Sequence, residues 1–326
     1  MTRLLIKKAM HEAALLFCAC GLMVFVFCWA RVWILSQFDL QQFRPLLDQL
    51  RPFEKFSPVP LEQLLTYRGS LAMTFHEPVL ILCILVWSIA RGSDVVSGEI
   101  NRGTLEMLLA QPITRWQLLW TQAVVGTLGL ALLCLLVWLG LAVGIQTNSV
   151  REQIAPTVEL TIPFTPFRIP VQIGAAQEVL TPMAEHVDAR VLIAPSCQLF
   201  AFGFFVFCLS VMLSSFDRYR WRTLGIVIGV YIVQLLVLLL SRATTSMEWL
   251  GYFTFLSAYR PDSTVHFARY SWWDAWLLIV PTARQTTSWP STLGPLGLTT
   301  VLAALGLLFL AGAAWRLRTR DIPAPI

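Results

Sequence analysis

The sequence predicts an all-α polytopic membrane protein, a single transmembrane domain over residues 1–326 with six membrane-spanning helices. The chain is 56% hydrophobic and only 13% charged, whereas soluble domains are about 45–50% apolar and about 25% charged. Its apolar residues gather in runs long enough to cross a bilayer. Its cations cluster at the ends of those runs. This composition argues against a disordered chain, a nucleic-acid-binding domain and a disulfide-stapled secreted module.

The expected spans are apolar runs with the length of a membrane helix. They cover residues 13–35, 71–90, 117–146, 195–215, 223–241 and 294–315. A further apolar stretch, Trp272–Val280, is too short to cross. Its tryptophans suit the headgroup boundary, so we expect a re-entrant or interfacial helix before the last span. The first span is longer than the apolar core of a signal peptide and lacks an A-x-A cleavage site, so we expect it to be retained.

The residues before the first span have an amphipathic pattern. On a helix, most polar side chains of residues 3–12 fall on one side, and Leu5, Ile6, Ala9 and Met10 fall on the other. This pattern predicts an N-terminal helix that lies in the cytoplasmic interface before the chain enters the membrane. The alternative is an extended first span with basic flanks.

The placement of the cations predicts that both termini are cytoplasmic. With the N-terminus inside, 12 Lys and Arg fall in the 56 residues of segments 1–12, 91–116, 216–222 and 316–326. Only 11 fall in the 134 residues of the opposite segments, 36–70, 148–194 and 242–293. Because cytoplasmic connections carry the excess of cations, we expect a multi-pass protein of the cell (inner or plasma) membrane.

The long external segments give weaker signals. Val158, Leu160, Ile162 and Phe164 alternate with polar residues or proline, which favours a short edge strand or an extended segment. These segments either form a small subdomain or cover the mouth of a pore. All seven cysteines lie in or at the edges of the spans, where they suit packing and imply no disulfide framework.

The sequence contains no familiar catalytic, nucleotide-binding or metal-binding motif. It lacks G-x-x-x-x-G-K-[ST], G-x-S-x-G and H-E-x-x-H, so we predict no catalytic, cofactor-binding or metal-binding residues. Glu77 and Gln234 are the intramembrane polar candidates, because polar groups in a bilayer are costly and often functional. Glu77 can instead lie near the outer end of its span, and Gln234 can bond a neighbouring helix. Gly225 and Gly229 have a spacing that either marks a helix interface or occurs by chance.

The connection between the second and third spans has a defined pattern. Gly98 and Gly103 bracket a polar break, and leucines then give an apolar surface that ends at Pro112. Thr114 and Gln117 form a capping box for the next helix. A helix, a stop and a restart at the cytoplasmic membrane face predict either a docking surface for a soluble partner or a connector lying on the membrane.

Residues 97–115 resemble the cytoplasmic signature of the ABC type-2 transporter permeases. That signature reads E-x-x-x-G-T-L, followed by P-[IV]-[ST]-R before the third span. Here Glu99 begins the first part and Arg115 ends the second. The six-span layout, the N-terminal interfacial helix and the short apolar stretch before the last span are also similar to this family. One departure is Thr121-Gln122, where members often carry lysine.

The resemblance implies a cytoplasmic coupling helix that seats in a groove on a separate ATP-binding subunit. Glu99 would anchor it by charge-assisted hydrogen bonds, Gly103 would permit the turn, and Arg115 would contact the partner or hold the loop. The implied coupling residues are Glu99, Arg102, Gly103, Thr104, Leu105, Leu108, Pro112 and Arg115. ATP and Mg²⁺ would bind the partner ATPase, so this chain would need no cofactor of its own. A chain with six spans would form half of a pore, so we expect a second permease copy or a paired permease, surrounded by membrane lipid and without nucleic acid.

The sequence leaves more than one functional class open. The resemblance favours the permease subunit of an ATP-driven exporter. A membrane-embedded enzyme would use Glu77 and His76 as general acid and base. A non-transporting assembly or anchoring protein would bind partners through its external segments. Permeases of this resemblance handle ions, drugs, lipids, glycans and peptides, and no pattern in the spans identifies the substrate.

Overall fold

The computed structural model describes residues 2–38, 40, 44–51, 57, 61–103, 114–154, 157–161, 168–172, 177–268, 271–280 and 293–319. Six helices among them are long and apolar enough to cross a membrane. Single helices form five of these spans: α1 (Thr2–Ser36), α8 (Arg115–Thr147), α10 (Ile193–Phe216), α11 (Arg220–Ala243) and α13 (Pro295–Thr319). The second is a run of short elements: α4 (Tyr67–Met73), η3 (Thr74–His76), α5 (Pro78–Ser93), η4 (Asp94–Gly98) and α6 (Glu99–Asn101). Each coincides with an expected span, which confirms the all-α polytopic class.

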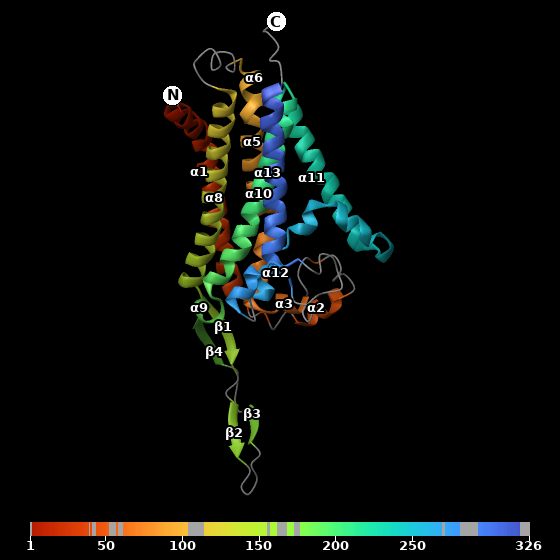
Figure 1. The fold of residues 1–326 in the computed structure, drawn as a ribbon. Coiled ribbons are helices and arrows are strands. Elements are labelled where there is room, and N and C mark those ends of the chain that lie inside the picture. Colours follow the sequence, from red (N-terminus) through yellow and green to blue (C-terminus); the bar gives the residue numbers. More distant parts are fainter. Residues whose placement is uncertain are drawn as a thin grey trace.

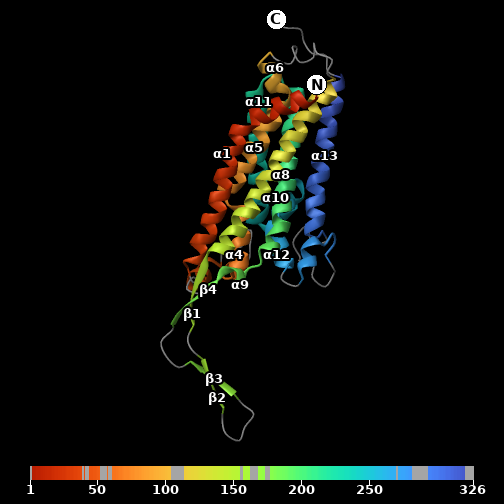
Figure 2. The same cartoon turned by 90° about the vertical axis from the view of Figure 1, so that its left-hand side faces the viewer.

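The helices form a bundle around α10 (Figures 1 and 2). α10 contacts α5, α8, α11 and α13, and α1 packs along α8. Close packing between α5 and α8 depends on glycine, because a Cβ on Gly129 would stand 2.1 Å from the ring of Trp87. The Trp87 indole N–H donates to the Gly126 carbonyl oxygen at 3.0 Å, which satisfies this buried donor. Small residues on α8 therefore let the large ring of Trp87 pack between the two helices.

α11 is peripheral to this bundle. Only 11% of its most apolar stretch is buried inside the protein, compared with 67% for the span that contains α10. Figure 1 shows α11 leaning away from the other helices toward its C-terminal end. Among the described residues, no atom lies within 4 Å of the position that a Cβ would take on Gly225 or Gly229. The small-residue spacing of α11 therefore packs against nothing in the described part of this chain.

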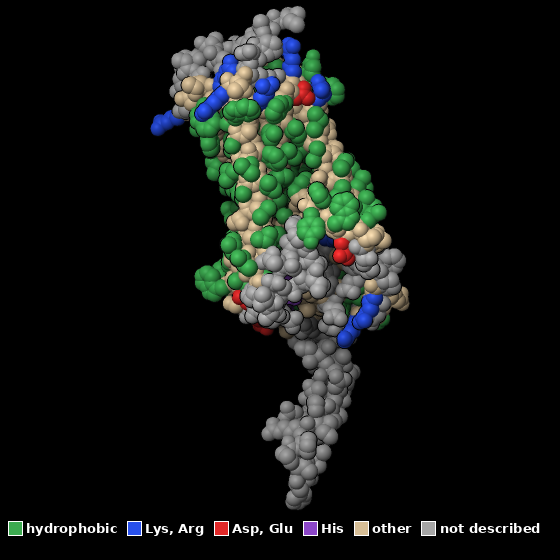
Figure 3. All heavy atoms as spheres, turned by 45° about the vertical axis from the view of Figure 1, so that its right-hand side comes forward, with side chains coloured by type: hydrophobic (Ala, Val, Ile, Leu, Met, Phe, Trp, Pro, Cys, Tyr) green, Lys and Arg blue, Asp and Glu red, His purple; other side chains and the backbone are tan. Residues whose placement is uncertain are grey.

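Hydrophobic side chains cover the middle of the molecule and cations gather at its ends (Figure 3). Both termini lie at one end of the bundle, together with α6 (Figure 1). We call this the terminal end; it comprises the starts of α1, α8 and α11, the η4–α6 turn and the end of α13. The four segments expected to share one side of the membrane thus meet at one end of the bundle. Which side of the membrane this end faces stays a prediction.

The N-terminal helix differs from expectation. Residues 2–36 form one continuous helix, and its first turns lean away from the bundle axis (Figures 1 and 2). The amphipathic segment is therefore continuous with the first span and not a separate helix, and its place in the membrane interface stays a prediction. The continuity has a physical reason, since the segment contains no proline and Leu5 and Ala9 are buried on one side.

A β-ribbon extends from the opposite end of the bundle (Figures 1 and 2). β1 (Ser149–Ile154) pairs antiparallel with β4 (Gln177–Pro182), so that Ser149 lies opposite Pro182. β2 (Thr157–Thr161) pairs antiparallel with β3 (Arg168–Gln172). The strand expected from the alternation at 158–164 is confirmed over its first half. Ile162 and Phe164 lie outside the described residues.

Short elements connect the spans at this opposite end. They are α2 (Arg44–Leu50), α3 (Leu61–Leu64), α9 (Met183–His186), η5 (Ala189–Leu192), η6 (Thr245–Phe253), η7 (Phe255–Ala258), α12 (Pro261–Phe267) and η8 (Trp272–Trp276). The helix expected over Trp272–Val280 is wrong beyond Trp276, because Leu277 is extended and Ile279 bridges Leu293. The carbonyl oxygens of Leu277 and Leu278 accept hydrogen bonds from the backbone N–H groups of Leu296 and Gly294, respectively. These N–H groups at the start of α13 replace the helical donors that a longer helix would provide.

Candidate functional site

At the terminal end, the second span changes from α-helix to a turn of π-helix. The π-turn η4 is fully buried and lies between α5 and α6. Its opened backbone is satisfied by α10, since the Ser214 hydroxyl accepts hydrogen bonds from the backbone N–H groups of Val96 and Ser97 at 3.3 and 2.8 Å. The same hydroxyl donates to the Ser93 carbonyl oxygen at 3.1 Å. A side chain inserted into the helical hydrogen-bond ladder thus holds the irregular turn, a geometry frequent at functional sites.

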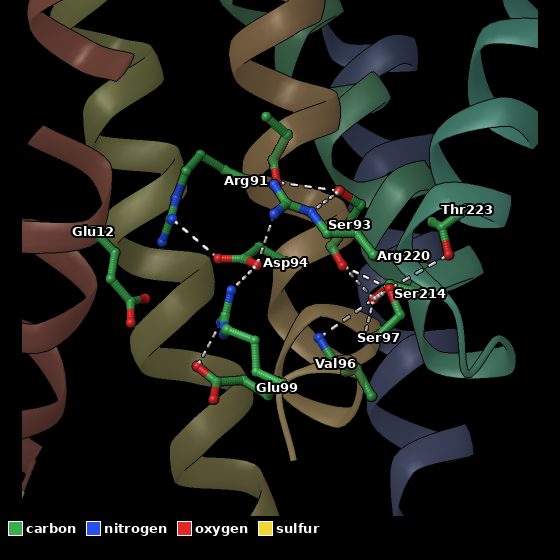
Figure 4. A network of polar contacts seen from close by, with 12 residues as sticks. Glu12, Arg91, Ser93, Asp94, Val96, Ser97, Glu99, Ser214, Arg220 and Thr223 are labelled. Carbon is green, nitrogen blue, oxygen red and sulfur yellow. Dashed lines mark hydrogen bonds and ion pairs between the residues drawn. The ribbon is translucent and has the colours of Figure 1, made fainter. Parts of the chain in front are cut away.

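Charged side chains gather beside this turn (Figure 4). We call the ion cluster the set Lys8, Glu12, Arg91, Asp94, Glu99, Arg102 and Arg220. Asp94 is its centre, because its carboxylate lies 2.8 Å from Arg102, 3.4 Å from Arg91 and 3.5 Å from Arg220. The cluster joins the first helix, the second span and the start of α11.

Glu99 links the second span to the first helix. Its side chain is fully buried, and its carboxylate accepts hydrogen bonds from Lys8 at 3.0 Å and from Arg102 at 3.1 Å. Lys8 also lies 3.7 Å from Glu12, one helical turn further along α1. A buried carboxylate is tolerated only when cations and hydrogen-bond donors compensate it. Glu99 therefore ties α6 to α1.

The two central arginines are held in different ways. Arg91 is 5% exposed, and its guanidinium donates to the side-chain oxygen of Gln122 on α8 at 2.9 Å. Its Nε has no hydrogen-bond partner among the described residues. Burial lowers the pKa of Arg102, but its hydrogen bond with Asp94 and the neighbouring carboxylates outweigh that effect, so the pKa lies above its ordinary value. Arg102 stays charged in this setting.

A cavity of about 430 Å³ opens within the ion cluster. Its charged wall consists of Glu12, Arg91, Asp94, Arg102 and Arg220. Leu16 and Ala90 form an apolar wall on the side of the membrane core. In Figure 4, Glu12 extends from α1 toward the cluster that surrounds Asp94. The site thus combines a polar hollow with buried charges at the membrane boundary.

Four of the expected coupling residues are described, and each has partners within the chain. Gly103 has a φ of 70°, so the expected turn is confirmed with a backbone that favours glycine. Arg115 donates to the Leu317 carbonyl oxygen at 3.2 Å and so joins the start of α8 to the end of α13. Glu99 and Arg102 belong to the ion cluster. The other expected coupling residues, Thr104, Leu105, Leu108 and Pro112, lie outside the described residues.

The expected start of a new helix before the third span is confirmed. Thr114 accepts a hydrogen bond from the Gln117 backbone N–H at 3.2 Å, and the Gln117 side chain accepts one from the Thr114 backbone N–H at 3.1 Å. This reciprocal pair is the expected capping box. It fixes the residue at which α8 begins, immediately after the expected coupling segment.

The intramembrane candidates lie away from the ion cluster. Glu77 directly precedes α5 near the opposite end, where its side chain is one-third exposed and lies 3.4 Å from Arg31. Its neighbour His76 lies 3.2 Å from Asp262. The side-chain oxygen of Gln234 on α11 is buried and has no hydrogen-bond partner among the described residues. The candidates therefore do not converge on one site.

The sequence reasoning missed several members of the site. No motif in the sequence singles out Lys8, Asp94, Arg220 or Ser214. Sequence signals existed for some of them, since Arg91 and Asp94 are spaced to face each other on a helix. The departure at Gln122 also has a structural meaning, because its side chain is a hydrogen-bond acceptor for Arg91. No local pattern marks Ser214, which is brought to the π-turn only by the packing of α10.

This fold and site define a multi-pass helical membrane protein whose buried charges lie at one end of the bundle. Residues 14–322 match the family described as ABC-2 family transporter protein. Because the match spans most of the chain, the protein belongs to that family. It is thus an ABC transporter permease, the transmembrane and not the nucleotide-binding subunit, and its family generally pairs with an ATP-binding subunit. A comparison with curated proteins gave no significant match.

Proposed function

We propose that this chain is the permease subunit of an ATP-driven exporter and is coupled to a separate ATPase subunit through residues 97–115. The partner would bind ATP and Mg²⁺, and this chain would carry the substrate path. In this proposal the terminal end faces the cytoplasm of a cell (inner or plasma) membrane, as the excess of cations in its segments favours.

The observation that carries the proposal is the position of Glu99. It lies at the start of the expected coupling segment, is fully buried, and bonds Lys8 on α1 and Arg102. A partner that moves residues 104–113 would therefore pull on α1 and α5 through charged contacts. Arg115 extends the same link to α13 at the other end of the segment. The residues on the two sides of 104–113 thus contact other spans, through Glu99 on one side and Arg115 on the other.

A second permease, either another copy or a paired chain, completes the proposed pore. The uncovered face of α11 supports this part of the proposal. That helix carries Gly225 and Gly229 with nothing of the described chain against them, and such spacing lets helix backbones approach closely. Membrane lipid would cover whatever part of this face the second permease leaves open.

The test is co-expression of the permease with a candidate ATPase, followed by purification through a tag on the permease. We expect the ATPase to co-purify and its hydrolysis rate to depend on the presence of the permease. Glu99→Gln keeps the shape of the side chain but removes its charge, and we expect it to reduce this dependence at least severalfold while the permease is still inserted. Glu77→Gln is the matched control at the opposite end of the same span. Equal ATPase stimulation by both variants, or an ATPase that never co-purifies, would overturn the proposal.

A further inference from the structure

The cavity in the ion cluster has an excess of positive charge. Its wall contains the cations Arg91, Arg102 and Arg220 and the carboxylates Glu12 and Asp94. Lys8 and Glu99 adjoin it and form an ion pair with each other, so an excess of one cation remains among the described residues. Arg91 and Asp94 are buried, whereas Arg102 and Arg220 are each 37% exposed and stay partly hydrated. An excess cation at the partly exposed wall of a hollow attracts an anion to that hollow.

One donor in the wall of this cavity also lacks an acceptor. Arg91 is 5% exposed, and its Nε–H has no partner among the described residues, although its other nitrogens bond Asp94 and Gln122. Orphaned buried donors are rare in folded proteins. Arginine presents its donors in a planar fork that matches the oxygens of a phosphate group. An anion with several oxygens would satisfy both the charge and the free donor.

The shape and position of the cavity narrow the chemistry of the anion. Its volume of about 430 Å³ exceeds what a single bound water would need. Its wall combines charged side chains with Leu16 and Ala90 on the side of the membrane core. That division resembles the boundary between the headgroup and the acyl chains of a phospholipid. Basic pockets between helices at the cytoplasmic face are a recurrent setting for lipid headgroups.

We propose that this cavity binds a phosphate group, carried by an anionic membrane lipid or free in solution. The three arginines supply charge-assisted hydrogen bonds, and Glu12 limits the affinity by repulsion from the opposite wall. The site concerns this chain alone and does not depend on an ATPase partner, so it can fail or hold independently of the proposed function. It would place an anion beside the π-turn η4, which precedes Glu99.

The experiment measures binding of dioleoylphosphatidylglycerol to the purified, delipidated full chain by native mass spectrometry. Dioleoylglycerol, which has the same chains without the phosphate, is the matched ligand control. We expect one preferred phosphatidylglycerol per chain and no comparable binding of the diacylglycerol. Inorganic phosphate is then added as a competitor. Competition assigns the site to the phosphate group alone, whereas binding that resists competition assigns it to the lipid headgroup, and both results support the phosphate chemistry.

Three variants test the position of the site. Arg220→Gln removes a partly exposed cation from the cavity wall, and we expect about a tenfold loss of affinity. Glu12→Gln removes the opposing carboxylate, and we expect severalfold tighter binding with every arginine intact. Arg222→Gln is the control, because this residue lies two positions further along α11, pairs with Asp217 and does not line the cavity. Equal affinities for Arg220→Gln and Arg222→Gln, weaker binding by Glu12→Gln, or equal binding of diacylglycerol would overturn the proposal.

Discussion

Glu77 and Glu99 lie on the same membrane span and have opposite surroundings. Glu77 begins α5 at the end that carries the β-ribbon, is one-third exposed and has one cation, Arg31, at 3.4 Å. Glu99 follows the π-turn at the terminal end, is fully buried and has two cations at 3.0 and 3.1 Å. Hydropathy suggests the reverse, since Glu77 interrupts an apolar run and Glu99 belongs to a polar connection.

The comparison teaches that the position of a charge in a hydropathy profile does not determine its burial. A single carboxylate within an apolar segment can reach the boundary and pair there. A carboxylate in a polar segment can be buried when several helix ends converge and bring their charges together. Effects of mutation should therefore be larger at the terminal end than at the opposite end.

The two ends should differ most in whether a reagent outside the cell can label an introduced cysteine. Glu185→Cys lies on α9 at the opposite end, and Arg222→Cys lies on α11 at the terminal end. If the terminal end is cytoplasmic, a membrane-impermeant maleimide labels Glu185→Cys in intact cells and labels Arg222→Cys only after permeabilisation. The unmodified chain is the control for its native cysteines. The reverse labelling pattern would reverse the orientation.

Removal of Glu99 should give the largest loss of stability. Glu99→Ala leaves Lys8 and Arg102 without their shared carboxylate, although both cations are about one-third exposed and regain some hydration. We expect the free energy of unfolding to fall by about 2–3 kcal/mol, below the range for fully buried pairs. Denaturant or thermal unfolding in detergent measures it. A loss no larger than that of Glu77→Ala would show that the ion cluster contributes little to folding.

Substitution of Ser214 should give the second-largest loss of stability. Ser214→Ala removes the acceptor of two buried backbone N–H groups in the π-turn, and we expect a cost of about 1–2 kcal/mol. Ser210→Ala is matched on the same helix, because the Ser210 hydroxyl donates only to the Ile89 carbonyl oxygen. The same unfolding measurement compares the two variants. Equal losses would mean that Ser214 does not support the π-turn specifically.

The smallest effect is expected at Glu77. Its ion pair with Arg31 is long and both side chains are about one-quarter to one-third exposed, so Glu77→Ala should lower stability by less than about 1 kcal/mol. Raising the salt concentration should reduce the difference further, because exposed pairs are screened. A loss as large as that of Glu99→Ala would remove the distinction between the two ends.

Much of the fold follows from the sequence because a bilayer imposes a strong requirement. Each span must be apolar over about 20 residues, so all the spans were predictable from hydropathy. Local chemistry also predicted the capping box at Thr114 and the turn at Gly103. The β1–β4 pairing, by contrast, joins strands that are separated by a second hairpin, and no turn residue specifies it.

The site was only partly predictable because its members come from distant segments. Glu99 and Arg102 stand out in one motif, but Lys8 reaches Glu99 from α1, and Arg220 reaches Asp94 from α11. Gln122 and Ser214 are uncharged polar residues in largely apolar helices, and their partners depend on helix rotation. Where charges converge is decided by packing between spans, which a single-sequence pattern does not encode.

The π-turn has one further consequence, for the rotational phase of the second span. A turn that closes over five residues contains one more residue than an α-turn, which offsets everything after it by about 100° around the helix axis. A helical wheel drawn from α5 therefore assigns Glu99 to the wrong azimuth. If η4 tightened to a regular turn, Glu99 would swing away from Lys8. The direction in which Glu99 faces is thus set by one additional residue within a buried turn.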